Sequence, residues 1–361
     1  MSFDGQLVRR PSPGLIEVSR EYVCVRVTDM RGVDLSVWRF DYDLTFAALV
    51  ANADGTLYHQ YGNRGIEHAD THLSLASFEA LLRGSLEDHA AYVASKARRK
   101  ATAAETIEGT AQMQRRAKEG KLPECFHCHM VNGAHDYDAQ AAKRYDPDSV
   151  WRWPPSSRLG LTLAKDDQTL VEAVADGSAA ARAGLAVGDR LVRVGTRRVR
   201  SEGDVQWVLE ELPSKGGKLP VVYLRGDAER QTDLTLAKGW KEGTPEEVWR
   251  NSIFIRDPKP GFGGPLLSDS EKRKLGIAAD VAAFRVNYIV TWGEEAATGR
   301  AAQAAGIRKG DVVLSVAGKS DFLSPKHFQS WFRLTQKAGR AVAIEVLQGG
   351  EKKTLRMTPV E

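Results

Sequence analysis

A segment of twelve residues occurs twice in this chain, and its two copies limit the folds that the carboxyl-terminal half can adopt. Residues 183–194 read AGLAVGDRLVRV, and residues 305–316 read AGIRKGDVVLSV. The glycines, the aspartate and the alternate apolar residues keep the same register. Each copy predicts a short helix that ends at glycine, a Gly-Asp turn and a strand. The repeat therefore predicts two copies of one small domain.

Both copies continue with the same kinds of element. Val205 and Leu209 share one face of a predicted helix after the first copy, and Phe328 and Phe332 do so after the second. Closing strands are then predicted at residues 220–224 and 232–236, and at 342–347 and 354–357. This order resembles the PDZ domains of bacterial HtrA-type proteins. The resemblance covers residues 155–240 and 262–361, with a linker at 241–261.

The resemblance implies a peptide-binding groove in each domain. In PDZ domains, the carboxyl terminus of a ligand adds as a strand beside the strand that follows a Leu-Gly loop, and loop N–H groups hold its carboxylate. The matching loops are Leu159-Gly160-Leu161 and Leu275-Gly276-Ile277, and the grooves would be completed by Val205, Leu209, Phe328 and Phe332. Because these residues would be core in any PDZ domain, a groove that is filled internally is the alternative.

The segment Gly261–Leu266 is superficially similar to the G-N-S-G-G-P-L segment of serine proteases. Phe262 stands at the position of the nucleophilic serine, so the catalytic triad lacks its first member. No G-x-S-x-G, H-E-x-x-H or Gly-rich phosphate-binding motif occurs elsewhere in the sequence. We therefore do not expect a hydrolase.

The pentapeptide Cys125-Phe126-His127-Cys128-His129 contains two of the three cysteines and has the attachment pattern of a c-type haem. Two thiols at this spacing reach the two vinyl groups of one porphyrin, and the following imidazole can ligate the iron. We expect haem c bound by Cys125, Cys128 and His129. Two alternatives stay open. The cysteines could bind structural zinc together with a histidine, or form a redox dithiol.

The sixth position of such an iron needs a second ligand. His89, on a helix ahead of the motif, is our first choice, and Met113, Met130 and His135 are the other candidates. Residues 90–121 are rich in Ala, Arg, Lys and Glu, so they predict a long exposed helix between His89 and the motif. The motif then lies in a helical connector of residues 94–154.

The amino-terminal residues predict a small α/β domain. Strands are expected at residues 22–27, 45–50 and 56–61, with a helix at 33–40 and a hairpin turn at 52–55. An amphipathic helix should begin after Ser74, which is a good N-cap, and extend to Tyr92. This order resembles the second half of a thioredoxin fold over residues 1–93. The first strand and the Cys-x-x-Cys helix of that fold are missing, and Leu44 stands where thioredoxins have a cis-proline.

Composition narrows the possible partners. The chain has 51 basic and 47 acidic residues without a long basic block, so nucleic-acid binding is not expected. No segment has the ~20 apolar residues of a membrane span, and residues 1–10 lack a signal-peptide core. The haem motif nevertheless implies a periplasmic or otherwise exported protein, because bacteria attach haem c after export.

These patterns together predict an α/β and mainly-β multidomain protein. It would consist of a truncated thioredoxin-like domain, a helical haem-motif linker and two PDZ domains. The expected function is electron transfer or redox sensing, with PDZ domains that dock a redox partner protein or bind the carboxyl-terminal peptides of other proteins. The alternatives are a PDZ scaffold with structural zinc and a protein related to thiol-disulfide oxidoreductases.

Overall fold

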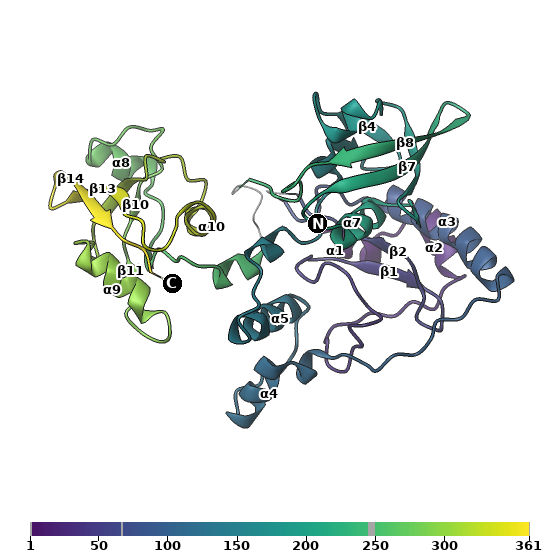
Figure 1. Cartoon of the computed structure of the whole chain (residues 1–361), viewed down its shortest axis with the longest axis horizontal. Helices are drawn as coiled ribbons and strands as arrows, with labels where there is room; N and C mark the ends of the chain where they lie inside the picture. The colour runs from purple at the N-terminus through teal and green to yellow at the C-terminus, as the bar shows by residue number, and fades with distance from the viewer. Residues whose placement is uncertain (1, 66–67, 245–249, 361) are drawn as a thin grey trace. The chain divides into compact units, whose positions relative to one another are not determined.

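The computed structural model describes residues 2–65, 68–244 and 250–360, which form two compact units (Figure 1). The units comprise Met1–Gly243 and Thr244–Glu361. The fold is mixed α/β, with several small antiparallel sheets in place of one large sheet. Because the second unit begins at Thr244, much of the predicted linker at 241–261 belongs to it.

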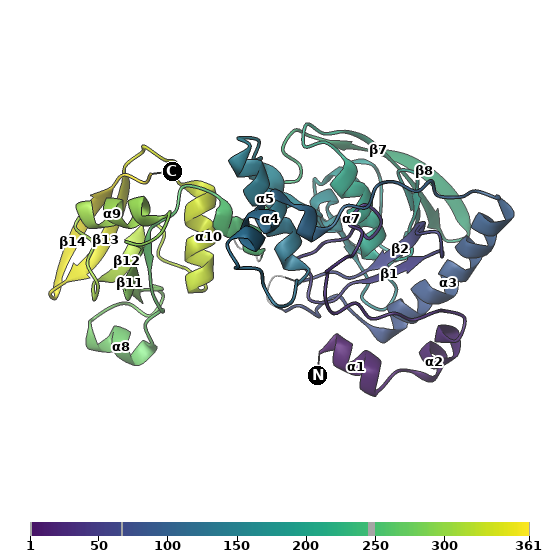
Figure 2. The ribbon, with the colours of Figure 1, turned by 90° about the horizontal axis from the view of Figure 1, so that it is seen from below.

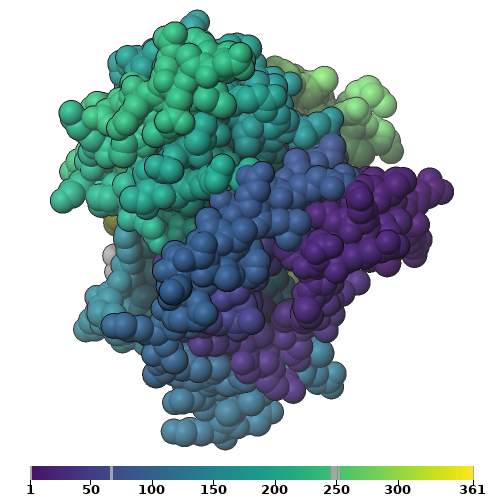
Figure 3. Space-filling model, turned by 90° about the vertical axis from the view of Figure 1, so that its right-hand side faces the viewer, coloured from purple at the N-terminus to yellow at the C-terminus, as the bar shows by residue number. Residues whose placement is uncertain are grey.

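The amino-terminal part of the first unit is built around one hairpin and one long helix. Helices α1 (Phe3–Arg9) and α2 (Pro13–Ser19) precede the antiparallel strands β1 (Ala48–Ala51) and β2 (Leu57–Tyr61). Helix α3 (Leu75–Ala94) follows, and its N-cap Ser74 accepts a hydrogen bond from the Ser77 N–H group, as predicted. Figure 3 shows α3, in blue, between the purple amino-terminal helices and the green strands that follow later in the chain. The predicted hairpin and helix are therefore confirmed.

Two predicted elements of this part are wrong. Residues 22–27 are extended but pair with no strand among the described residues, and the side chains of Val23, Val25 and Val27 are 94%, 78% and 60% exposed. Residues 33–40 form turns and no helix. A regular alternation of apolar residues predicts a strand only where a neighbouring strand and a core are available to it.

The predicted long helix at 90–121 is also wrong. Helix α3 ends at Ala94, and the segment after it is held by carboxylates of other segments. Asp54 accepts the N–H group of Arg99, and Asp34 accepts that of Glu105. These N–H groups therefore do not form the main-chain hydrogen bonds of a helix. The chain continues through η1 (Ile107–Gly109), α4 (Ala111–Lys118), α5 (His129–Ala141) and η2 (Pro147–Trp151).

A first repeat domain completes the first unit. Its elements are η3 (Ser156–Leu159), β3 (Leu161–Leu163), β4 (Val171–Val174), α6 (Ala179–Arg182), β5 (Arg190–Val194), β6 (Arg197–Arg198), α7 (Glu202–Glu211), β7 (Gly217–Arg225) and β8 (Ala228–Leu236). The larger sheet has the order β6-β5-β7-β8, and β3 pairs with β4. The predicted closing strands correspond to β7 and β8.

A second repeat domain forms most of the second unit. Its elements are η5 (Asn251–Ile255), β9 (Phe262–Gly263), α8 (Asp269–Lys274), β10 (Phe284–Arg285), β11 (Tyr288–Ile289), α9 (Ala296–Ala304), β12 (Val312–Val316), α10 (Pro325–Thr335), β13 (Val342–Gln348) and β14 (Glu351–Met357). The sheet order is β10-β12-β13-β14, and β9 pairs with β11. Helix α10 packs beside this sheet through Phe328 and Phe332 (Figure 2).

No helix in the described part of the chain is long and apolar enough to cross a membrane.

Candidate functional site: two grooves and a Cys-x-x-Cys-His segment

The loop Leu159-Gly160-Leu161 leads directly into strand β3. Gly160 has a φ of +85°, which is the left-handed region that favours glycine, and its carbonyl accepts the N–H group of Ala175 at 2.8 Å. A Cβ atom at this position would overlap the side chain of Ser178. Leu159 and Leu161 are fully buried in the domain core. Glycine is therefore the residue that both the backbone and the available space require here.

The equivalent loop of the second repeat domain is centred on Gly261. Its φ is +72°, and its carbonyl accepts the N–H group of Val290 at 2.8 Å, which matches the Gly160–Ala175 bond. A Cβ atom on Gly261 would overlap main-chain atoms of Thr298 and Gly299. Gly261 and Phe262 therefore take the places of Gly160 and Leu161. The segment that superficially resembled a protease motif is the start of this domain.

The predicted second loop, Leu275-Gly276-Ile277, lies elsewhere. Gly276 ends helix α8 with a φ of +64°, and Ile277 donates its N–H group to the carbonyl of Lys272. Leu275 is 41% exposed. This Leu-Gly pair is a helix C-cap, a common role of glycine, so the prediction that it forms a carboxylate-binding loop is wrong.

The four apolar helix residues predicted to line the grooves are core residues. Val205 and Leu209 of α7 and Phe328 and Phe332 of α10 are at most 1% exposed. Polar residues of both helices bond to main-chain carbonyls on either side of the loops. Gln329 of α10 donates to the carbonyl of Phe262 at 2.9 Å, and Gln206 of α7 donates to the carbonyl of Trp153 at 3.3 Å. Sequence reasoning missed them because it searched for apolar pocket residues.

The hairpin β1–β2 joins the first repeat domain through a buried histidine. His59 is 2% exposed, and its Nδ1 and Nε2 atoms lie 2.8 Å from Asp204 Oδ2 and 3.0 Å from Asp88 Oδ2. Arg197 donates to Asp204 at 3.1 Å, and Arg200 donates to Asp88 at 3.1 Å. This network connects α3, β2 and the amino-terminal end of α7. No sequence motif marked it, since its members lie far apart in the chain.

The network should make the stability of the first unit depend on pH. Burial lowers the pKa of His59, but hydrogen bonds to Asp204 and Asp88 outweigh it, so the pKa is raised. Burial favours the neutral form of Asp88, yet His59 and Arg200 hold its pKa at about 2. Because the pKa of His59 is higher in the folded than in the unfolded chain, its protonation stabilises the fold below about pH 6.5. This contribution is lost as the pH rises above that value. We expect urea midpoints to fall as the pH rises from 6 to 8, and His59→Gln to remove most of that slope. A slope that is equal in both proteins would contradict the assignment.

The segment Cys125–His129 precedes and begins helix α5. Cys125 and Cys128 are free thiols. Cys125 is exposed and Cys128 is half-buried, so burial raises the pKa of the Cys128 thiol. Phe126, between them, is 1% exposed, and its carbonyl accepts the Met30 N–H group. His127 and His129 are exposed and their rings stack with centroids 5.6 Å apart.

The candidate sixth ligands lie at different places. His89 is on α3, where its Nδ1 lies 3.0 Å from the Tyr58 hydroxyl, and α3 and α5 are well separated in Figures 1 and 2. Met113 is buried in the cluster that contacts Cys128 and Met130. His135 lies 3.6 Å from Glu105. His89 therefore lies on a different helix from the motif, whereas Met113 and Met130 belong to the cluster that includes Cys128.

Structural zinc needs at least three assembled protein ligands. Within residues 2–65, 68–244 and 250–360, no three His, Cys, Asp or Glu side chains are grouped closely enough to hold a metal ion. The donor set of haem c consists of two thiols and one imidazole within five residues, and that set is present with both thiols free. Cys125, Cys128 and His129 are the donors that haem c attachment would use.

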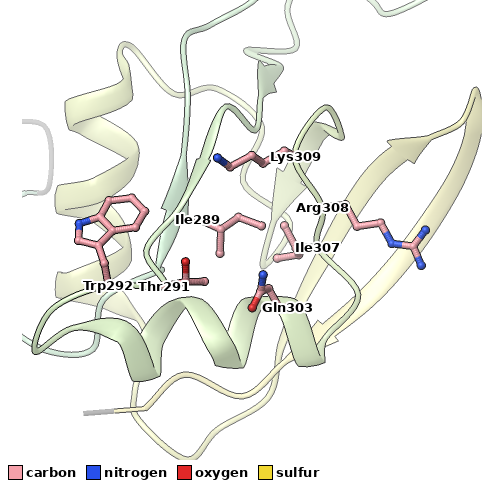
Figure 4. A pocket seen from close by; sticks show the side chains of 7 residues that line it. All are labelled: Ile289, Thr291, Trp292, Gln303, Ile307, Arg308 and Lys309. Carbon is pink, nitrogen blue, oxygen red and sulfur yellow. The ribbon is translucent and has the colours of Figure 1, made fainter.

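A cavity of about 400 Å³ lies in the second unit, and none of the predicted groove residues lines it. It is lined by Ile289, Thr291, Trp292, Gln303, Ile307, Arg308 and Lys309. Figure 4 shows that the side chain of Lys309 extends over it, whereas the guanidinium of Arg308 points away. Trp292 is 60% exposed. None of the sequence patterns predicted this cavity.

Comparison with known proteins bears on the first repeat domain. Residues 170–215 match the PDZ domain family. No curated protein sequence matches the chain. The solved structure of "HtrA-type protease AlgW with decapeptide" aligns with 16% identity and a TM-score of 0.24, over 48% of this chain and 49% of that one. This chain thus spans about half the length of that protein, and a TM-score this low does not establish a shared fold. The family match and the arrangement of β3 to α7 lead to one conclusion: the first repeat domain of this chain is a PDZ domain.

Proposed function

We propose that this chain binds carboxyl-terminal peptides through its PDZ fold. The observation that carries the proposal is the free edge of strand β3, which pairs only with β4 among the described strands. A ligand strand can add to such an edge, and the Gly160 loop precedes it as the carboxylate-binding loop does in PDZ domains. The second repeat domain, with Gly261 before β9, is proposed to have the same role.

Peptide binding can be tested with labelled decapeptides that end in Val, Leu or Phe and are measured by fluorescence anisotropy. We expect micromolar affinity, about −8 kcal/mol, for peptides with a free carboxylate. Amidated peptides of the same sequence should bind at least about tenfold more weakly, because a hydrogen bond to a charged group contributes roughly 1.5–3 kcal/mol. Equal binding of both forms would contradict carboxylate recognition.

We further propose that Cys125 and Cys128 carry covalent haem c with His129 as an axial ligand. Two observations support this: Cys125 and His129 are exposed close together in the chain, and apolar side chains adjoin Cys128. Haem bound there would supply a one-electron couple. The peptide grooves would then recruit a redox partner, and the protein would function in an exported compartment such as the periplasm.

The visible spectrum separates the haem proposal from its alternatives. Protein from an exporting host with haem c maturation should show a reduced α-band that survives acid-acetone extraction. Cys125→Ala, Cys128→Ala and His129→Ala should each lose or shift that band, while Cys24→Ala is the matched control and should not. Met113→Ala should convert a low-spin spectrum to high-spin if Met113 is the sixth ligand. A colourless protein with equimolar zinc would contradict haem attachment. A colourless protein with a reversible Cys125–Cys128 disulfide would instead support the thiol-disulfide alternative.

A further inference from the structure

The residues just before the first loop lie along the polar face of helix α7. The main-chain N–H group of Trp153 donates a hydrogen bond to Glu210 Oε2 at 2.7 Å. The main-chain carbonyl of Trp153 accepts a hydrogen bond from the Gln206 side chain at 3.3 Å. Ser156 donates its N–H group to Glu202 Oε1 at 2.7 Å. Residues 202, 206 and 210 are spaced by four and therefore form one stripe along the helix. Residues 153–156 run the length of that stripe.

The contact excludes water. Trp153, Ser156, Glu202 and Gln206 are each no more than 5% exposed, and the indole of Trp153 packs edge-on against Trp207 at 5.8 Å. The Ser156 hydroxyl also donates to the carbonyl of Leu161 at 3.1 Å. Leu161 follows the loop, so its carbonyl belongs to the strand beside which a ligand would add. The chain's own segment thus bonds to both the helix and the strand of the groove.

The second repeat domain has contacts at the corresponding positions, but they differ in kind. Phe254 precedes Gly261 by seven residues, as Trp153 precedes Gly160. The Arg333 guanidinium lies 5.2 Å from the centre of the Phe254 ring, and Arg256 donates to the Arg333 carbonyl at 3.2 Å. Gln329 bonds to the carbonyl of Phe262, the counterpart of Leu161. Phe254 is 36% exposed and contacts the helix through its ring, so the buried main-chain contact described for residues 153–156 belongs to the first domain.

We propose that residues 153–156 are an intramolecular occupant of the first groove, which a peptide ligand must displace before it can bind. The proposal deepens the peptide-binding function above and rests on it. A conformation that must open before binding lowers the apparent affinity by the fraction of open molecules. Displacement leaves Glu202 and Gln206 facing the ligand, so the groove should favour peptides that donate hydrogen bonds there, such as those with Ser, Thr or Lys near the carboxyl terminus.

Single substitutions that weaken this contact without altering the core test the proposal. Glu210→Ala removes the acceptor of the Trp153 N–H group, and Ser156→Ala removes the bond to Leu161. Asp233→Ala is the matched control, because it removes the same charge from β8 of the same domain, where Asp233 pairs with Lys218. The full chain is used throughout, with amide hydrogen exchange as a readout that needs no ligand.

We expect the amides of Trp153 and Ser156 to be protected in the unsubstituted chain and to exchange at least about tenfold faster in Glu210→Ala. Decapeptides with a free carboxylate should bind this variant about tenfold more tightly, and Ser156→Ala should act in the same direction. Asp233→Ala should change neither measurement. Unprotected amides in the unsubstituted chain, or an affinity that Glu210→Ala leaves unchanged, would overturn the proposal. If exchange responds as expected but no variant binds any peptide, residues 153–156 still cover the helix, and the peptide-binding function is what fails.

Discussion

Asp204→Ala should lower the free energy of unfolding of the first unit by about 3–5 kcal/mol, because it breaks a buried ion pair and leaves its partners uncompensated. The Asp204 side chain is fully buried between His59 and Arg197, and it also accepts the N–H group of Arg200. Without it, the imidazole keeps Asp88, and the guanidinium of Arg197 keeps the carbonyl of Tyr58 and its contact with the Trp207 ring, neither of which replaces the lost carboxylate. Urea denaturation followed by circular dichroism measures the loss.

Asp233→Ala is the control for this experiment. Asp233 lies on β8 of the same domain, is largely exposed, and pairs with Lys218 at 3.6 Å. An exposed ion pair contributes at most about 1 kcal/mol, so this variant should be close to the unsubstituted protein. Similar losses in the two variants would mean that the contact between the hairpin and α7 is not formed in solution.

Gly261→Ala should destabilise the second unit by more than about 3 kcal/mol, whereas Gly276→Ala should cost only about 1–2 kcal/mol. Both glycines have a positive φ, which disfavours any side chain by roughly 1–2 kcal/mol. Only at Gly261 would the added Cβ also overlap main-chain atoms, which cannot move aside without distorting helix α9. At Gly276 no atom lies within 4 Å of the added Cβ.

Thermal unfolding of the full chain, with the second transition assigned by amide exchange, compares the two variants. The variant that loses more stability identifies the constrained loop: Gly261 according to the structure, or Gly276 according to the sequence pattern. A larger loss at Gly276 would return Leu275-Gly276-Ile277 to consideration as the carboxylate-binding loop.

The repeat correctly predicted a helix-turn-strand unit, a following helix and the closing strands in each domain, because its information is local. A glycine after a short helix, a Gly-Asp turn and an alternating strand specify their own conformations. The second loop was missed because a Leu-Gly pair has two common uses. Gly276 ends helix α8, and a capping box of Ser268 and Glu271 begins that helix. The capping signal was present in the sequence and distinguishes the two uses.

The amino-terminal part shows where sequence patterns lose their information. Val23, Val25 and Val27 have the alternation of a strand, but a strand forms only with a neighbour, and no local pattern reports whether one exists. The pairing of His59 with Asp204 spans 145 residues. Each residue alone resembles an ordinary polar surface residue, so only the folded chain reveals that the two meet.

The grooves illustrate a different difficulty. Val205 and Leu209 were predicted to contact a ligand because apolar residues line pockets, but the same residues also fill cores. Glu202 and Gln206 of α7 would be assigned to solvent by composition alone, but they are buried. Their burial depends on residues 153–156, and that contact follows from the tertiary structure rather than from helical periodicity.

The contact between the β1–β2 hairpin and α7 determines which segment of this protein can be transferred into another protein and still fold. A fusion that transferred residues 155–240 alone would carry Asp204 without His59, and Gly203 without the Gln60 main chain against which it packs. The transplanted helix would then begin with an uncovered carboxylate and lose the chain that shields it. Recombination should therefore keep the hairpin, α3 and the first PDZ domain together in one segment.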